Sequence, residues 1–478
     1  MKIKFAGAAG GNVTGSRHLV TFNGKNILLD CGMFQGKRDE AYEMNTNFLF
    51  DPKKIDAVIL SHAHIDHSGD LPVLVKQGFN GPIYCTPATM DLCKYMLLDS
   101  AFIQEREVEF LKKRQAEGKG NGRAGKPQEE IKEPIYGTED AEKTIALFQP
   151  ISYEETFSPT PGMVVSFYDA GHILGSALVH MMFYDKKTKK HLRVCFTGDL
   201  GRRGLPLLRD PQLIPETDIL ITECTYGNRL HAALQSVEQD LAVIVNDVCK
   251  KGGKLIIPSF ALERAQEVVY YLNILNKKHL IPEIPIYVDS PLSVNVTEVF
   301  RAHPECFDKD TYEKFLDQGE DPFGFERLKY TSSVDESKGL NDKKGPMIII
   351  SASGMCEHGR ILHHLRNNIE DRKSTVLIIG YQAENTLGRK LVNGEKSVNI
   401  FGEPKVVKAD IFVMDAFSAH ADRSDLLEYI GRVKGLQKIF LVHGESKQET
   451  AFSESLRQNG YTNISIPTLG EEVEIPFE

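Results

Sequence analysis

The segment His62-Ala63-His64-Ile65-Asp66-His67 places four residues of metal-ligand type within six positions, directly after the strand-like run 57–60. Residues two apart on an extended chain point the same way, so His62 and His64 can hold one ion. Asp66 and His67, at the turn into a helix-like segment, can face a second ion. The alternative is a solvated loop that happens to be rich in histidine. The chain has only 15 histidines in 478 residues, which makes chance a poor explanation of this cluster.

Four other strand-like runs also end in a histidine or an aspartate. Core strands need no ionisable residue at their tips, and buried imidazoles and carboxylates are costly unless they are paired or metal-bound. The repetition therefore indicates one shared site, built from several strand ends. The residues at these four ends are Asp30, His172, Asp199 and His443.

The region between Asp199 and His443 has a different pattern, in which strand-like and helix-like segments alternate. This is the rhythm of a doubly wound α/β unit. The segment 118–126, GKGNGRAGK, is typical of a flexible loop. The strand-like runs that precede helix-like segments are 255–257, 284–288, 347–350 and 376–379.

Composition excludes several classes of protein. Acidic residues outnumber basic ones, 66 against 57, and the sequence pI is near 6.0, so a polyanion must be held locally rather than by a global basic field. Eight cysteines without a CxxC pair argue against a disulfide framework and against a cysteine zinc ribbon. No apolar run approaches the roughly 20 residues of a membrane helix. We therefore expect a soluble, reduced, cytoplasmic protein that makes no membrane contact.

The pattern HxHxDH at a strand end resembles the signature of the metallo-β-lactamase fold. His172, within the segment 169–177, resembles the next ligand of that superfamily, and Asp199, within 196–201, resembles its bridging aspartate. Taken singly, His172 would be an ordinary loop histidine and Asp199 a turn residue. Their order after the cluster favours the ligand interpretation for both.

The second half of the chain resembles the β-CASP branch of the superfamily, whose members process RNA or DNA. Three segments match its motifs in the right order: 222–227 the acidic motif, 417–422 the second motif and 441–445 the third. The resemblance covers essentially the whole chain. It implies an α/β fold, a metallo-β-lactamase αββα sandwich with an inserted doubly wound α/β β-CASP domain. The expected domains are 1–207, the inserted 208–408, and 409–478, which completes the sandwich.

The resemblance and the residues assign the same metal ligands. One ion would take His62, His64 and His172, the other would take Asp66, His67 and His443, and Asp199 would bridge them. This all-nitrogen-and-oxygen shell suits zinc first, with manganese or iron as alternatives. Asp30 resembles the family's aspartate that orients a ligand histidine through its other ring nitrogen. A plain turn-forming aspartate is the alternative for Asp30.

Two adjacent divalent ions favour hydrolysis of phosphodiester bonds. His420 is the candidate general acid for the leaving oxygen, and Glu223 is the carboxylate that orients it or keeps it protonated. The alternative for His420 is a residue at a helix start, since the segment 418–422 also fits that pattern. The predicted catalytic residues are His420, Glu223, Asp66 and Asp199.

RNA phosphates are expected to bind at strand ends of the inserted domain, where helix N-terminal amides can hold an anion and arginines can add charge. Serines are also ordinary helix caps, which is the alternative for each of these loops. The predicted phosphate-binding residues are Ser259, Arg264, Ser290, Ser353, Gly354, Arg360 and Arg389.

These observations predict a ribonuclease that acts on single-stranded RNA, with endonuclease and 5′ exonuclease action both left open. One alternative is a hydrolase of a small thioester or lactam, which needs neither the inserted domain nor Glu223 and His420. A non-catalytic relative would have lost ligands, and none is lost here. A DNA-directed β-CASP nuclease is a further alternative. That branch typically has an apolar residue at the third motif, where this chain has His443, so RNA is favoured.

Overall fold

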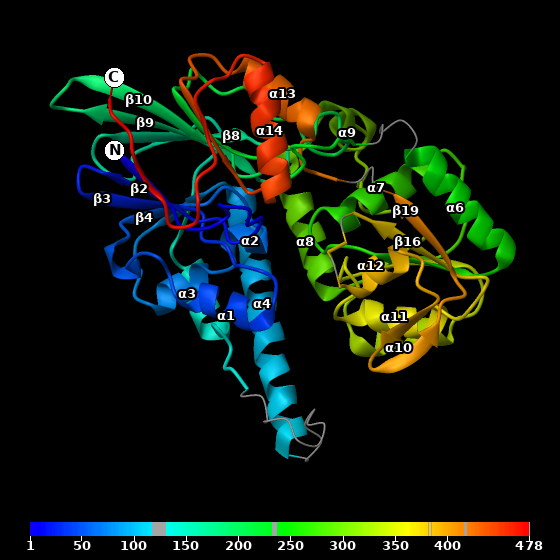
Figure 1. Cartoon of the computed structure of the whole chain (residues 1–478). Coiled ribbons are helices and arrows are strands. Elements are labelled where there is room, and N and C mark those ends of the chain that lie inside the picture. Colours follow the sequence, from blue (N-terminus) through cyan, green and yellow to red (C-terminus); the bar gives the residue numbers. More distant parts are fainter. Residues whose placement is uncertain (117–130, 232–236, 381, 384, 415–417, 478) are drawn as a thin grey trace. The chain divides into compact units, whose positions relative to one another are not determined.

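The computed structural model describes residues 1–116, 131–231, 237–380, 382–383, 385–414 and 418–477 (Figure 1). By their contacts they form two compact units. Unit 1 comprises Met1–Gly201, Pro211–Arg229 and His420–Glu478, and unit 2 comprises Arg202–Asp210 and Leu230–Ala419. The loop predicted at 118–126 lies outside the described residues, and the domain boundaries expected at 207/208 and 408/409 stay a prediction.

Unit 1 contains two seven-stranded sheets that pack face to face. In spatial order, the first sheet consists of β22 (Glu472–Glu474), β1 (Lys2–Phe5), β2 (His18–Phe22), β3 (Lys25–Leu29), β4 (Ala57–Ile59), β5 (Ile83–Cys85) and β6 (Phe148–Pro150). The second consists of β21 (Ile464–Ser465), β20 (Lys438–Val442), β11 (Ile219–Glu223), β10 (Lys190–Phe196), β9 (Ala177–Asp185), β8 (Met163–Asp169) and β7 (Thr156–Phe157).

Alternating side chains of the strands build the layers of unit 1. On β10, Val194 and Phe196 point into the core between the two sheets, whereas Cys195 points to the outer helical layer, as the period of two in a strand requires. On β11, Ile221 faces the inner core and Leu220 the outer layer. These strands are apolar on both faces, because one face packs against the other sheet and the opposite face is covered by helices. The expected αββα sandwich is therefore confirmed.

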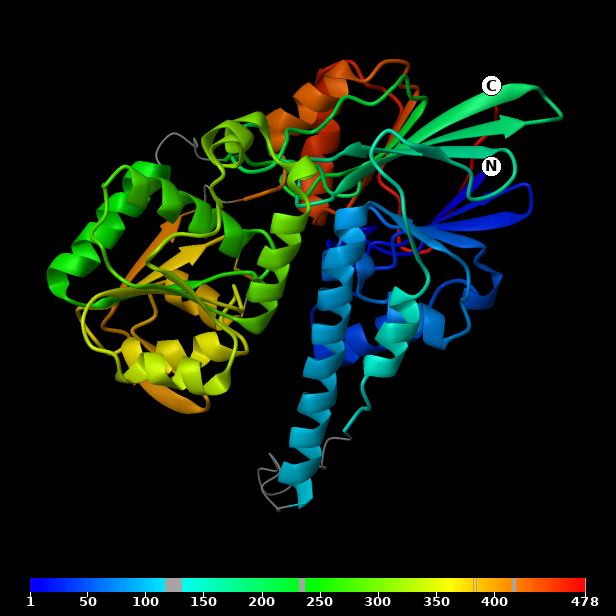
Figure 2. The same cartoon turned by 180° about the vertical axis from the view of Figure 1, so that it is seen from behind.

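Helices cover both outer faces of this sandwich. On the side of the first sheet, α4 and α5 lie side by side, as Figures 1 and 2 show from opposite directions. Side chains of α13 and α14 pack against the outer face of the second sheet. The helices of unit 1 are α1 (Arg38–Thr46), α2 (Ile65–Ser68), α3 (Leu71–Lys76), α4 (Pro87–Ala116), α5 (Thr138–Ile145), α13 (Arg423–Arg432) and α14 (Ser446–Gln458), with a 3₁₀ turn at Pro52–Lys54.

Strand directions explain why the predicted ligands meet. β10, β11 and β20 are parallel neighbours, so their carboxyl ends deliver Asp199, Glu223 and His443 to one edge of the second sheet. β3 and β4 are also parallel and deliver Asp30 and His62 at one edge of the first sheet.

Unit 2 contains an all-parallel six-stranded sheet and a two-stranded ribbon. The strand order is β14 (Leu328–Thr331), β13 (Ile286–Asp289), β15 (Met347–Ser351), β12 (Lys254–Pro258), β16 (Thr375–Ile379) and β19 (Asp410–Met414). The ribbon pairs β17 (Ser397–Ile400) with β18 (Glu403–Val406).

The predicted alternation of strand and helix in this region is confirmed, because helices α7, α8, α11 and α12 follow strands β12, β13, β15 and β16. The helices of unit 2 are α6 (Val237–Lys251), α7 (Arg264–Lys277), α8 (Pro291–Ala302), α9 (Lys309–Lys314), α10 (Val334–Asp342), α11 (Arg360–Asn368) and α12 (Leu387–Val392), with 3₁₀ turns at Pro304–Cys306 and Leu316–Gln318. Within the described ranges, no helix combines the length and the apolar character that crossing a bilayer requires.

A buried carboxylate, Asp289, joins several elements of unit 2 at the end of β13. Its oxygens accept hydrogen bonds from Arg360 Nη1 (2.8 Å), His364 Nε2 (2.6 Å), Ser337 Oγ (2.6 Å) and Thr331 Oγ1 (2.7 Å). Burial alone would raise the pKa of Asp289, but these bonds, led by the one from His364, lower the pKa to about 2. The stabilisation is therefore present above the pKa of the unfolded chain and is lost as the pH falls toward 2.

We expect Asp289→Ala to lower the free energy of unfolding by about 3–5 kcal/mol, because it leaves the half-buried Arg360 and the buried His364 without their carboxylate. Urea unfolding at pH 7 measures the change. Asp410→Ala is the control, since it removes an exposed ion pair with Lys251 (2.7 Å) in the same unit and should cost less than about 1 kcal/mol. Equal losses in the two variants would contradict this role of Asp289.

Candidate metal centre

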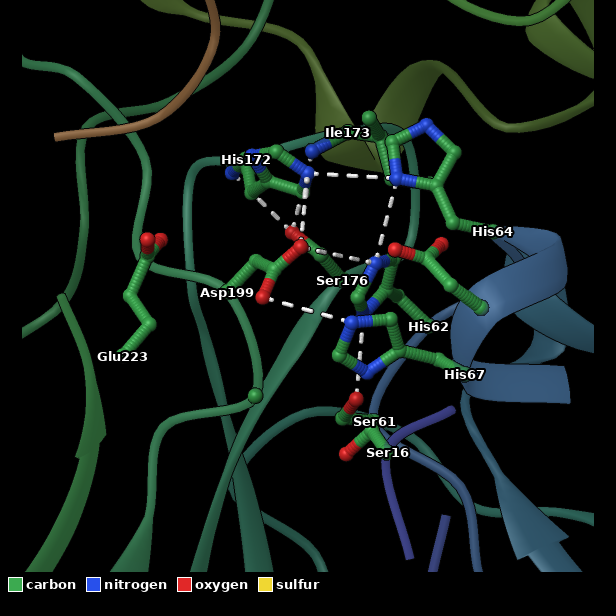
Figure 3. A network of polar contacts seen from close by, with 12 residues as sticks. Ser16, Ser61, His62, His64, His67, His172, Ile173, Ser176, Asp199 and Glu223 are labelled. Atoms are coloured by element: carbon green, nitrogen blue, oxygen red, sulfur yellow. Dashed lines mark hydrogen bonds and ion pairs between the residues drawn. The ribbon is translucent and has the colours of Figure 1, made fainter. Parts of the chain in front are cut away.

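The three histidines and the aspartate that were predicted to hold the first ion lie together. His62 follows β4, His64 is two residues further on, and His172 follows β8. His62 Nε2 lies 3.2 Å from His64 Nδ1, and His172 Nε2 lies 3.3 Å from the same atom. Oδ2 of Asp199 is 3.5 Å from Nε2 of both His62 and His172. Figure 3 shows these rings converging on that oxygen.

The second predicted set also comes together. The short helix α2 carries Asp66 and His67, and His443 follows β20 with a left-handed φ of 52°. His67 Nε2 lies 3.1 Å from His443 Nε2, and Asp66 Oδ2 lies 3.5 Å from His443 Nε2. Oδ1 of Asp199 is 3.3 Å from His67 Nε2. All seven predicted ligands therefore meet at one place in unit 1.

Asp199 stands between the two sets and turns one oxygen to each. Its side chain is 1% exposed, and Oδ1 has no hydrogen-bond partner among the described residues, although it lies beside His67. A buried carboxylate oxygen without a hydrogen bond is costly unless a cation takes its place. Zinc–nitrogen bonds of 2.0–2.1 Å in a tetrahedral shell place ligand atoms roughly 3.3 Å apart, close to the separations seen here. The donor set fits a pair of divalent cations.

The protonation states of His62, His64 and Asp199 suit metal binding, whereas Asp199 and Asp30 outweigh the effect of burial and raise the pKa of His67 well above its usual value. Burial lowers the pKa of His64 to about 4 and the pKa of His62 well below its usual value, so both rings are neutral near pH 7. Burial would raise the pKa of Asp199, but the surrounding histidines, led by His443, hold it well below its usual range. Neutral imidazole and ionised carboxylate are the forms that coordinate a cation.

Asp30 holds His67 from behind. The His67 ring donates from Nδ1 to Asp30 Oδ2 (2.7 Å), which leaves Nε2 directed at the ligand site. Asp30 also accepts bonds from Ser61 N (2.7 Å), Ser61 Oγ (2.9 Å) and Ser16 Oγ (3.2 Å), and its φ of 58° is left-handed. The geometry favours the orienting role over that of a plain turn residue.

Sequence reasoning missed three hydroxyl residues that support the ligands. Ser61 and Ser16 bind Asp30, and Thr225 Oγ1 lies 3.2 Å from His443 Nδ1 and donates to His443 O (3.0 Å). Ser61 directly precedes the histidine cluster and Thr225 lies within the acidic motif. Their positions next to or within those motifs could have indicated that they support the ligands. Ser16 lies in a glycine-containing loop and gave no comparable signal.

His420 and Glu223 form a pair beside the ligands. His420 Nδ1 lies 3.0 and 3.1 Å from the two Glu223 oxygens and 4.0 Å from Asp199 Oδ2. Burial would lower the pKa of His420, but the carboxylates, led by Glu223, raise it to about 9. Glu223 is itself fixed by Leu200 N, which donates to it at 2.7 Å. The pair can therefore hold a proton on His420 at neutral pH.

The helix start considered for this segment lies just beyond His420. Asp422 is the N-cap of α13, and its side chain accepts bonds from Ser424 N (2.7 Å) and Asp425 N (3.1 Å). His420 itself forms an isolated bridge with Gly201. Phe417, the first residue of the motif, lies outside the described residues. The helix-start interpretation thus applies to Asp422, and the general-acid interpretation applies to His420 two residues before it.

The predicted phosphate-binding residues lie at strand ends of unit 2, but two arginines have other partners there. The Arg264 guanidinium is buried and paired with Glu267, and Arg360 donates to Asp289 and to Ser332 O (2.6 Å). An anion would have to compete for both. Ser290 caps α8 by accepting from Ser293 N (3.2 Å), as its alternative role predicted. Binding of RNA by the full set, with Ser259, Ser353, Gly354 and Arg389, stays a prediction.

Sequence comparisons match three families along the chain. Residues 12–177 match the metallo-beta-lactamase superfamily, 265–391 match the Beta-Casp domain, and 405–467 match the Zn-dependent metallo-hydrolase RNA specificity domain. Five of the seven ligand-type residues lie within the first match and His443 lies within the third, whereas Asp199 lies between the first match and the second.

Named relatives are similar in sequence to this chain over all or most of its length. Ribonuclease TTHA0252 of Thermus thermophilus is 34% identical over 475 residues, which are 99% of this chain and 100% of that protein. Transcription termination factor FttA of Methanosarcina mazei is 33% identical over 88% of this chain, but the match spans only 63% of that factor. A crystal structure of an Enterococcus faecalis protein of unknown function matches 99% of both chains with a TM-score of 0.54 at 12% identity, which is a likeness of fold.

Proposed function

The chain belongs to the metallo-β-lactamase superfamily, in the branch that carries a Beta-Casp domain, and on that premise we propose that it is a ribonuclease acting on single-stranded RNA with two divalent metal ions. Membership confirms the resemblance inferred from the sequence motifs and makes the chain a metal-dependent hydrolase. The match to an RNA specificity domain and the relative named a ribonuclease support RNA as the substrate.

The observation that carries this proposal is the position of Asp199 between two ligand sets, next to the His420–Glu223 pair. His62, His64 and His172 would hold one ion, and Asp66, His67 and His443 the other, with zinc as the metal that suits these ligands best. Two such ions supply an activated water and stabilise the charge of an in-line phosphoryl displacement. Hydrolysis of a thioester has no comparable need of a poised acid, because a thiolate leaves without a proton.

His420 provides the proton for the leaving oxygen. Its Nδ1 is bound to Glu223, so Nε2 is the ring nitrogen that can deliver a proton to the 3′ oxygen as the P–O bond breaks. Glu223 keeps the imidazole charged and fixes its orientation. Asp66 and Asp199 would act from the ligand sets, where their carboxylates would hold the metals that supply the activated water.

The substrate is a single strand, because the ligand atoms are gathered at buried strand ends and a backbone without its partner strand can approach them more closely. Anchoring of the RNA backbone falls to Ser259, Ser290, Ser353, Gly354 and Arg389, with Arg264 and Arg360 contributing only if they give up their carboxylate partners. Duplex RNA of the same sequence should be cleaved much more slowly.

Product ends test the chemistry. Attack by water with the 3′ oxygen as the leaving group should give 5′-phosphate and 3′-hydroxyl ends. Incubating the metal-loaded protein with RNA labelled at either end, followed by end-group analysis, measures this. The finding of 2′,3′-cyclic phosphates would identify the ribose hydroxyl as the nucleophile and would refute the mechanism. Equal cleavage of duplex and single strand would refute the substrate preference.

A further inference from the structure

The parallel sheet of unit 2 changes its winding direction between β12 and β15, which are neighbours. From β12 the chain crosses through α7 to β13, on the far side of β15. From β15 it crosses through α11 to β16, on the far side of β12. Ligands of doubly wound sheets bind outside the carboxyl ends of the strands at such a switch point. The loops that follow β12 and β15 are therefore where a ligand of this unit is expected.

Phe260 is the second residue after β12, and its side chain is held out in solvent. It is 38% exposed, whereas Ser259 and Leu262 in the same loop are 1% and 3% exposed. Single exposed apolar side chains are common on protein surfaces, so exposure alone carries no weight. What distinguishes Phe260 is its place at the switch point and the support that its ring receives there.

Gly354, in the loop after β15, lies directly against the Phe260 ring. A Cβ atom at Gly354 would stand 2.9 Å from Cδ2 and 3.0 Å from Cε2 of Phe260, closer than real contacts allow. Gln382 Nε2 donates to Gly354 O (3.0 Å), and Ser259 N donates to Ser351 O (3.0 Å), so both loops are anchored. The ring is thus fixed along one side while part of it remains exposed.

The exposed part of the Phe260 ring favours a flat, apolar partner over an anion. The nearest charged residues in sequence are Glu263 and Arg264, which are both buried, and Arg264 is paired with Glu267. An exposed aromatic ring cannot bind a phosphate, but every nucleobase has a π-face that stacks on it. We propose that Phe260 stacks on a nucleobase of single-stranded RNA bound at this switch point, an inference that rests on the proposed function.

Substitution of the ring tests this directly. Phe260→Leu keeps an apolar side chain but removes the π-face, and should weaken RNA binding roughly 5- to 150-fold. Phe260→Tyr should bind as the parent does. Phe412→Leu is the matched control, because Phe412 is 41% exposed on β19 at the edge of the same sheet and should have no effect. Binding is measured by fluorescence anisotropy of metal-loaded protein in a His420→Ala background, which keeps the RNA intact.

A double-mutant cycle with RNA locates the stacked base. A single abasic position is moved along the oligonucleotide, and at one position it should weaken binding to the parent by the same factor as Phe260→Leu. With RNA that is abasic at that position, Phe260→Leu should bind as tightly as the parent protein does. In the cleavage-competent protein, Phe260→Leu should raise KM and change kcat less than about 2-fold, since stacking takes no part in the bond that breaks and contributes equally to binding of the substrate and of the transition state.

The outcomes separate this inference from the nuclease proposal. Unchanged binding by Phe260→Leu, or the same abasic penalty with and without the ring, would overturn the stacking role. If the effects of Phe260→Leu and of the abasic position are coupled but the protein cleaves no RNA, stacking would be supported and the ribonuclease proposal would be overturned. Absence of RNA binding by every variant would overturn both. An equal loss in Phe412→Leu would mark the effect as non-specific and also overturn the assignment.

Discussion

Asp199→Ala is expected to release both metal ions and to abolish RNA cleavage. One oxygen of Asp199 lies 3.5 Å from His62 and His172 in the first ligand set, and the other lies 3.3 Å from His67 in the second. Removing the shared carboxylate leaves the remaining buried imidazoles without the negative charge that a pair of cations requires. The loss of activity should exceed the roughly 10²–10⁴-fold that a missing general acid costs. Elemental analysis and cleavage assays measure the two effects.

The control for this variant is Asp218→Asn. Asp218 is another buried carboxylate of unit 1, but its partners are Arg193 Nη2 (2.7 Å) and Arg193 Nε (3.0 Å), and it is not a predicted ligand. The control should keep two ions per chain even if its stability falls. Retention of both ions by Asp199→Ala would contradict the bridging role.

His420→Ala and His443→Ala should fail in different ways. Without His420 the protein should keep both ions and cleave roughly 10²–10⁴-fold more slowly, because only the proton donor is missing. A substrate whose leaving 3′ oxygen is replaced by sulfur should restore part of the rate, since sulfur leaves without a proton. His443→Ala should weaken or lose the second ion, because Nε2 of His443 lies 3.1 Å from His67 and 3.5 Å from Asp66. The sulfur substrate should not rescue it.

Metal content and rescue together decide between these roles. If His420→Ala loses an ion while His443→Ala keeps both, the assignments are reversed. If the sulfur substrate rescues both variants equally, neither residue is the specific donor. Glu223→Gln provides a further comparison, because it keeps the shape of the residue that holds His420 but removes the charge that raises its pKa.

The meeting of the seven predicted ligands at one place could be predicted because each of them lies in a short, recognisable stretch of sequence. His62 to His67 lie within one strand end and one turn, where backbone periodicity fixes their directions. Asp199 and His443 come together because the parallel strands β10, β11 and β20 bring their carboxyl ends to one edge. His172 reaches the same edge because β8 and β10 are both antiparallel to β9 and so run in the same direction. The family resemblance supplied their grouping into two sets.

Other features depend on tertiary contacts that the sequence does not encode locally. Arg264 and Arg360 begin helices after strands, which favours anion binding, but the folded chain places Glu267 and Asp289 against them. The strand β19 was not predicted from the sequence. It lies at the edge of the sheet with Phe412 and Val413 both exposed, so its sequence lacks the alternation of a half-buried strand. The support of Phe260 by Gly354 joins loops almost a hundred residues apart.

The most direct test of a two-metal ribonuclease is a titration of metal-free protein with zinc, and in parallel with manganese, in which RNA cleavage is plotted against ions bound per chain. Two ligand sets that share Asp199 predict that cleavage rises and then levels off at about two bound ions per chain. A plateau at one bound ion, or no cleavage of single-stranded RNA at any occupancy, would contradict the account.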